Sequence, residues 1–71
     1  MITVERKELQ TREFNGYVIS KGLQVGDKVK GMDFIFWIQD KHKEFRKIKG
    51  IGDRRPYTQE EYEEFYKFIR R

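Results

Sequence analysis

The chain has 71 residues, with 16 Lys and Arg against 12 Asp and Glu for a formal net charge of +4, and it contains no cysteine. This length holds a single small domain, which excludes a multidomain enzyme, and an aromatic content of 15% excludes a disordered chain. Without cysteine there are neither disulfides nor thiolate metal ligands, and no apolar run reaches the ~18 residues of a membrane span, so we expect a soluble cytoplasmic protein.

The first turn signal is the pair Asn15-Gly16. Asn-Gly tolerates the positive φ angles of a type I′ turn, so residues 11–14 and 17–20 are expected to pair as an antiparallel hairpin. Before this hairpin, Ile2 and Val4 alternate with other residues as in a strand, whereas residues 5–9 also fit a helical turn. The sequence leaves both alternatives open.

The middle of the chain favours further strands. A Gly-Asp turn at residues 26–27 precedes the segment 33–38, which is apolar on both faces and predicts a central strand. Residues 40–43 are expected to turn the chain back into a strand over 44–48. A glycine-bearing loop at residues 50–52 then leads toward the C-terminus.

The C-terminal segment predicts a helix over residues 58–70. Thr58 and Glu61 have the spacing of a capping box, and Tyr57 and Tyr62 that of a hydrophobic staple. An apolar stripe then recurs with helical spacing at Tyr62, Phe65, Tyr66 and Ile69.

Together these elements predict an α+β fold. Alanine is absent, and β-branched and aromatic residues suit strands, so we expect four to five strands in a small antiparallel β-sheet or a partly open barrel, SH3-like or OB-like. One C-terminal α-helix packs on this sheet. The single domain, residues 1–71, thus divides into a β-rich part (1–52), a loop (53–57) and the helix.

The positive charge is concentrated in the middle of the chain. Residues 21–55 carry ten basic and five acidic side chains, a net charge of +5, whereas both ends are nearly neutral. The densest part is expected to be a basic hairpin that contacts phosphates, with an aromatic ring for stacking. The candidate binding residues are Lys41, Lys43, Phe45, Arg46, Lys47, Lys49, Arg54 and Arg55. The same charges also fit an acidic protein partner or a plain solvated face.

The stretch Ile48-Lys49-Gly50-Ile51-Gly52 resembles the glycine hairpin of helix-hairpin-helix DNA-binding proteins. The resemblance implies that backbone amides of this turn meet a phosphate. That motif has a helix on each side, whereas Pro56 falls where the second helix should already run. The alternative is a glycine-bearing loop in which Ile51 plugs the sheet beneath the helix.

A second stretch, from Leu23-Gln24-Val25-Gly26-Asp27-Lys28-Val29 through residues 45–51, resembles the opening of staphylococcal-nuclease-like OB domains. The resemblance implies an OB-like topology, and it maps two catalytic positions of that family onto Asp27 and Arg46. The family's Asp-Thr-Pro-Glu stretch is replaced by Gly52-Asp53-Arg54-Arg55, which lacks its glutamate base. We therefore expect no nuclease activity.

Other chemistry has little basis in this sequence. His42 is the only histidine and is expected in an exposed turn, and Ser20 is the only serine, so no catalytic triad is expected. A transition-metal site needs two or more His or Cys ligands. We expect no enzyme, no catalytic residues, no metal and no cofactor.

The hypothesis is therefore a small non-catalytic module that contacts the nucleic-acid backbone with little sequence preference. The alternative is a protein-interaction factor or an inhibitor of a host protein. For this alternative, a homodimer of the chain is a further expectation. In size and in its Lys-, Glu- and Ile-rich composition the chain also resembles small orphan proteins of bacteriophages and prophages, many of which bind host factors.

Overall fold

The chain folds into three helices and a minimal sheet. The computed structural model describes residues 1–52 and 54–70. In chain order the elements are β1 (Ile2–Thr3), the 3-10 turn η1 (Lys7–Leu9), α1 (Arg12–Lys21), β2 (Lys28–Val29), α2 (Gly31–Lys49) and α3 (Gln59–Ile69). The strands pair antiparallel, with Ile2 opposite Val29. The predicted sheet or barrel of four to five strands with a single helix is therefore wrong.

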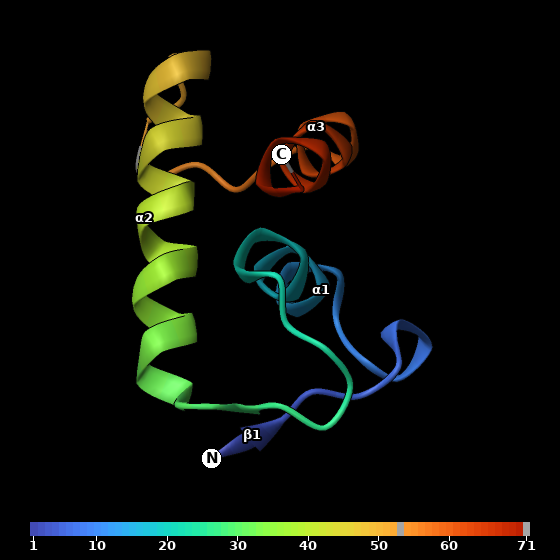
Figure 1. Cartoon of the computed structure of the whole chain (residues 1–71). Coiled ribbons are helices and arrows are strands. Elements are labelled where there is room, and N and C mark those ends of the chain that lie inside the picture. The colour runs from blue at the N-terminus through green and yellow to red at the C-terminus, as the bar shows by residue number, and fades with distance from the viewer. Residues whose placement is uncertain (53, 71) are drawn as a thin grey trace.

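The longest helix, α2, supports the other two. In Figure 1, α2 stands upright along one side, and α1 and α3 both pack against its inner face, with α1 near its N-terminal half and α3 near its C-terminal half. Arg12 pairs with Glu63 near the starts of α1 and α3, while Gly16 lies against Ile69 farther along both. These contacts show that α1 and α3 run in the same direction.

The hairpin expected over residues 11–20 is replaced by α1. Thr11 caps this helix, because its hydroxyl accepts a hydrogen bond from the Phe14 N–H at 3.2 Å. Gly22 ends it in the left-handed conformation at φ 66°, which glycine adopts without strain. The Asn-Gly pair lies inside α1 and does not turn the chain. Gly16 has no side chain, which leaves room for Ile69 to pack against the helix.

The strands expected over 33–38 and 44–48, and the turn between them, are replaced by α2. Only part of the apolar run 33–38 points inward, because Ile35 and Phe36 are exposed on the outer face. The inward residues have helical spacing, namely Phe34, Trp37, Ile38 and Phe45. The helix ends at Gly50, which has a φ of 69°.

Two apolar clusters form the core. One lies between α1, the N-terminal segment and the start of α2, and consists of Val4, Phe14, Tyr17 and Val29. The other lies between the end of α2, the following loop and α3, and consists of Phe45, Ile51, Tyr57, Phe65 and Ile69. Trp37 packs against both, so α2 joins them into one domain.

The prediction for the C-terminal helix is confirmed. The capping box forms, since Thr58 accepts from the Glu61 N–H and the Glu61 carboxylate accepts from the Thr58 N–H. The staple also forms, with the rings of Tyr57 and Tyr62 5.1 Å apart. At the N-terminus, both the expected strand and the expected helical turn are found in part. The strand β1 ends at Thr3, and the 3-10 turn η1 follows at Lys7–Leu9.

Candidate nucleic-acid interface

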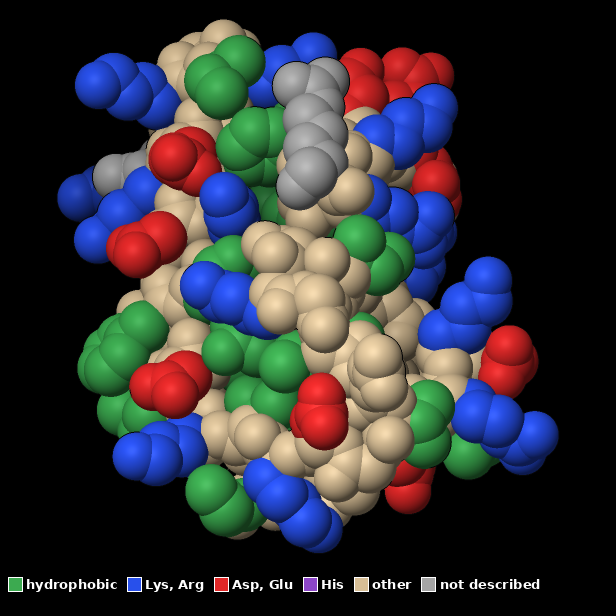
Figure 2. Space-filling view, viewed as in Figure 1, with side chains coloured by type: hydrophobic (Ala, Val, Ile, Leu, Met, Phe, Trp, Pro, Cys, Tyr) green, Lys and Arg blue, Asp and Glu red, His purple; other side chains and the backbone are tan. Residues whose placement is uncertain are grey.

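The predicted binding residues lie on α2 and on the loop that follows it, not on a hairpin. Figure 2 shows Lys and Arg side chains around the upper, C-terminal end of α2, with acidic side chains among them. Farther down, hydrophobic side chains occupy the outer flank of the same helix. The predicted residues differ in exposure and in partners, and these differences decide which of them can reach a ligand.

Phe45 is not available to stack on a base. Only 4% of the residue is exposed, and its ring lies 5.4 Å from that of Phe65 and 5.5 Å from that of Tyr57. The prediction of a stacking ring at this position is wrong, because the helical turn of α2 carries Phe45 to the inner face.

Arg46 organises the loop after α2. Its guanidinium donates to the carbonyl oxygens of Gly52 and Arg55, the latter at 2.9 Å, and lies 4.5 Å from the ring centre of Tyr57. A side chain with these partners holds the loop against α2. Arg46 thus fixes the position of its neighbours more than it offers charge to a ligand.

Three other predicted cations are held in ion pairs. Lys41 pairs with Glu44 at 3.4 Å on α2, and Lys49 pairs with Glu64 across the α2–α3 contact. Arg55 pairs with Glu61, and the hydrogen bonds from Arg55, followed by the bond from the Thr58 backbone, lower the pKa of Glu61 to about 2. The remaining net charge at these positions is small.

Lys43, Lys47 and Arg54 remain for an external partner. All three are exposed, and within residues 1–52 and 54–70 none of them forms an ion pair. Lys43 and Lys47 are four residues apart on α2, so they stand one turn apart on the same face. Asp40 precedes Lys43 and is exposed near the same face. These two lysines, on an outward face of α2, are the main part of the predicted basic surface that is exposed for binding.

One residue on this face was missed by the sequence analysis. Phe36 is 57% exposed, the largest exposed fraction of any aromatic residue among those the structure describes. It precedes Lys43 by seven residues, which is about two helical turns, and so shares the outer face with it. Phe36 precedes Lys43 by 7 residues and Lys47 by 11, and both spacings place side chains on one face of a helix. The sequence therefore contains this signal, but it can be recognised only when residues 31–49 are assigned to one helix.

Two amides of the glycine turn after α2 are already hydrogen-bonded within the chain. The Gly50 N–H donates to the carbonyl of Lys47 at 3.3 Å, and the Ile51 N–H donates to that of Arg46 at 2.9 Å. Both amides close the end of α2, and Ile51 is buried in the core. Helices flank the turn, but α3 starts only at Gln59, so the geometry differs from a helix-hairpin-helix site.

His42 is also placed differently from its prediction. It lies half-buried on α2, with Nδ1 2.9 Å from the Tyr57 hydroxyl and its ring stacked on Phe65 at 4.3 Å. Burial lowers the pKa of His42, and the positive charge of Arg46 lowers it further. The histidine packs against the aromatic rings of the core and is not an exposed turn residue.

The two positions suggested by the nuclease-like resemblance lie apart. Asp27 stands in the turn before β2, where its carboxylate accepts from the Gln24 N–H, whereas Arg46 is near the far end of α2. Among the described residues no group of three His, Asp or Glu side chains could hold a metal ion. Among the helices of the described residues, none is both long enough and apolar enough to span a membrane.

Comparison with protein-family models, with curated proteins and with solved structures found no match to this chain.

Proposed function

We propose that the protein is a non-catalytic module that binds the phosphate backbone of nucleic acid through the outer face of α2, with little sequence preference. The observation that supports this proposal is the pair Lys43 and Lys47, which stand on one exposed helix face and form no ion pair with any described residue. Arg54 extends the positive charge into the loop. Phosphate contacts by such side chains carry no sequence information.

Phe36 supplies a stacking ring in place of Phe45. An exposed aromatic ring beside cations is the combination that binds single strands, because every base has a face that can stack. The negative charge of Asp40 weakens phosphate binding at this face. We therefore expect low affinity that falls steeply with salt, and tighter binding by the variant Asp40→Asn.

Variants of the two lysines test the proposal. Fluorescence anisotropy would follow labelled mixed-sequence single strands and duplexes at about 50 mM and about 250 mM salt, a range over which phosphate binding falls strongly. The variant Lys43→Gln/Lys47→Gln should reduce the slope of log K against log salt by about 1.5, since each lost phosphate contact removes about 0.7–0.9. The control Arg6→Gln/Lys30→Gln has the same net charge and should bind like the wild type. Equal loss in both variants would show a diffuse charge effect and contradict a site on α2.

A protein-interaction factor is the second candidate, favoured by one observation. Met32, Ile35 and Phe36 are 57%, 43% and 57% exposed and form a continuous apolar ridge on the N-terminal half of α2. Such a ridge is typical of a surface that another protein or a second copy covers. Sedimentation over a range of concentrations tests self-association, and the variant Met32→Glu/Phe36→Glu should abolish any association that uses this ridge. Binding to a protein partner should also persist at about 250 mM salt.

A further inference from the structure

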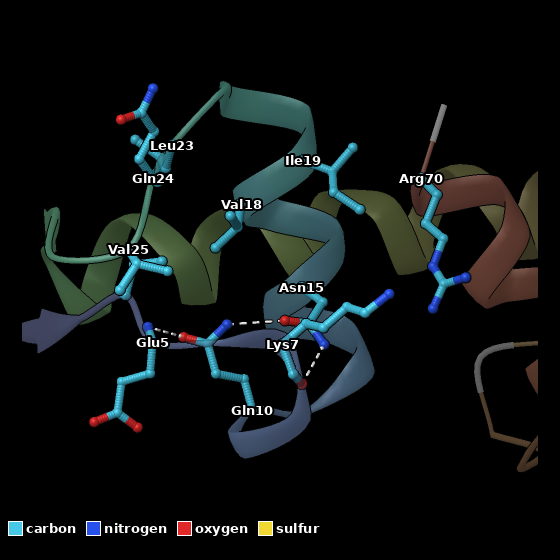
Figure 3. A pocket seen from close by; sticks show the side chains of 11 residues that line it. Glu5, Lys7, Gln10, Asn15, Val18, Ile19, Leu23, Gln24, Val25 and Arg70 are labelled. Carbon is cyan, nitrogen blue, oxygen red and sulfur yellow. Dashed lines mark hydrogen bonds between the residues drawn. The ribbon is translucent and has the colours of Figure 1, made fainter.

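A separate pocket of about 370 Å³ lies between the N-terminal segment, α1 and the end of α3. Figure 3 shows its walls. One wall is apolar, with side chains from α1 and from the loop that leads to β2, namely Val18, Ile19, Leu23 and Val25. The opposite side is polar. The pocket therefore has the two-sided character of a site for an amphipathic small molecule.

The polar side is held in place by a chain of amide hydrogen bonds. The Glu5 N–H donates to the Gln10 side-chain oxygen at 2.6 Å, the Gln10 amide donates to the Asn15 side-chain oxygen at 2.8 Å, and the Asn15 amide donates to the Lys7 carbonyl at 3.0 Å. These bonds, drawn in Figure 3, fix both amide groups. Each NH₂ group has a second hydrogen, so both side chains can still donate to a ligand.

Two cations line one end of this pocket. Lys7 and Arg70 both line it, and in Figure 3 the ends of their side chains point toward one another. Both are exposed, and neither belongs to an ion pair within residues 1–52 and 54–70. The carboxylate of Glu5 points away from them in the same view. Positive side chains that line the same end of a pocket attract an anionic group.

We infer that this pocket binds a small organic anion, with its carboxylate or phosphate head between Lys7 and Arg70 and its apolar body against Val18, Ile19 and Val25. The planar fork of an arginine matches both head groups with paired hydrogen bonds. The amide of Asn15, which also lines the pocket, has a second hydrogen to donate to the same head. The inference is independent of nucleic-acid binding on α2, since it involves none of the residues on that face.

A titration of ¹⁵N-labelled protein with matched ligands tests the inference. Octanoate and octyl phosphate carry both parts of the ligand, octanol lacks the charge, and inorganic phosphate lacks the apolar body. We expect octanoate or octyl phosphate to bind with a Kd of about 1 mM, a value reasonable for about ten non-hydrogen atoms, and to shift Val18, Ile19 and the side-chain amide of Asn15. Octanol and inorganic phosphate should each bind at least tenfold more weakly.

Variants and vesicles distinguish binding in this pocket from contact with a membrane surface. Lys7→Gln and Arg70→Gln should each weaken octanoate binding by about tenfold, while the control Lys67→Gln should leave it unchanged; circular dichroism checks that each variant is folded. Equal binding of octanol and octanoate, or no shift at 10 mM octanoate, would overturn the inference. Binding to anionic phosphatidylglycerol vesicles without binding of free octanoate would also overturn it, since that would indicate a surface contact with a membrane.

Discussion

Gly16 on α1 faces Ile69 on α3 so closely that a Cβ atom added at Gly16 would lie 2.8 Å from both Cδ1 and Cγ1 of Ile69. Ile69 is only 2% exposed, so its side chain has little room to move away. This contact sets the separation between α1 and α3. It also explains why a residue that weakens helices stands in the middle of α1.

The variant Gly16→Ala should therefore be less stable than the wild type. Alanine favours a helix interior over glycine by about 1 kcal/mol, whereas overpacking costs about 1–3 kcal/mol, so we expect a net loss of about 1 kcal/mol in the free energy of unfolding. Urea denaturation measures it. Gly31→Ala is the control, because there the nearest atom to an added Cβ is 4.0 Å away. A gain in stability from Gly16→Ala equal to that from Gly31→Ala would contradict the close contact.

The second prediction compares two phenylalanines on α2. Phe45 is 4% exposed and Phe36 is 57% exposed. Phe45→Ala should cost about 3–5 kcal/mol, which is as much as the whole stability expected of so small a domain, while Phe36→Ala should change it by less than about 0.5 kcal/mol. Thermal melts followed by circular dichroism distinguish them. Phe45→Leu removes less of the side chain, so we expect this variant to fold, and it should still lower the melting temperature more than Phe36→Leu.

The third prediction concerns the pH dependence of stability. Since burial lowers the pKa of His42 in the folded protein, the unfolded chain binds the proton more tightly, and its histidine has a pKa of about 6.5. The free energy of unfolding should therefore fall as the pH decreases below about 6.5. His42→Gln, which cannot take up this proton, should show a flatter profile between pH 7.5 and 5. Parallel profiles for the two proteins would mean that His42 has no part in this dependence.

The fourth prediction applies at lower pH and rests on Glu61. Its pKa of about 2 lies below its usual value of 4.5, so the stabilisation is complete above about pH 4.5 and is lost as the pH falls toward 2. Glu61→Gln keeps a capping-box residue but carries no charge for Arg55. The stability of this variant should depend less on pH between 4.5 and 2 than that of the wild type. Glu60→Gln, on the same helical turn, is the control and should keep the pH dependence of the wild type. Acid titration of the urea midpoint for the three proteins provides the measurement.

The parts of the fold that depend on neighbouring residues could be predicted from the sequence. In α3 the cap at Thr58, the staple at Tyr57 and the apolar stripe all lie within residues 57–69, and they agree with one another. The Gly-Asp turn at residues 26–27 is similarly local, because the Asp27 N–H donates to the carbonyl of Gln24.

The other helices depend on contacts that the sequence does not display. The run 33–38 has apolar residues on both sides of α2, because Ile35 and Phe36 remain exposed, and this hides the helical period. In α1 the Asn-Gly pair is a strong local turn signal, but the contact of Gly16 with Ile69 comes from the opposite end of the chain. Tertiary packing overrides the local preference in both cases.

The candidate site was predictable in charge but not in geometry. The concentration of basic residues after position 40 is evident from the sequence. Lys49 and Arg55, however, are held by Glu64 and Glu61 of α3, and Phe45 is turned inward. Which cations remain for a partner follows only from the packing of α3 on α2.

The most direct test of phosphate binding is to map where an oligonucleotide touches the wild-type protein. Backbone amide shifts of ¹⁵N-labelled protein would be recorded with mixed-sequence single strands and duplexes at about 50 mM and about 250 mM salt. We predict shifts centred on Lys43 and Lys47 and extending to Phe36 and Arg54, larger with single strands, that largely disappear at the higher salt. An absence of shifts at low salt, or shifts on α1 and the N-terminal segment instead, would contradict a nucleic-acid interface on α2.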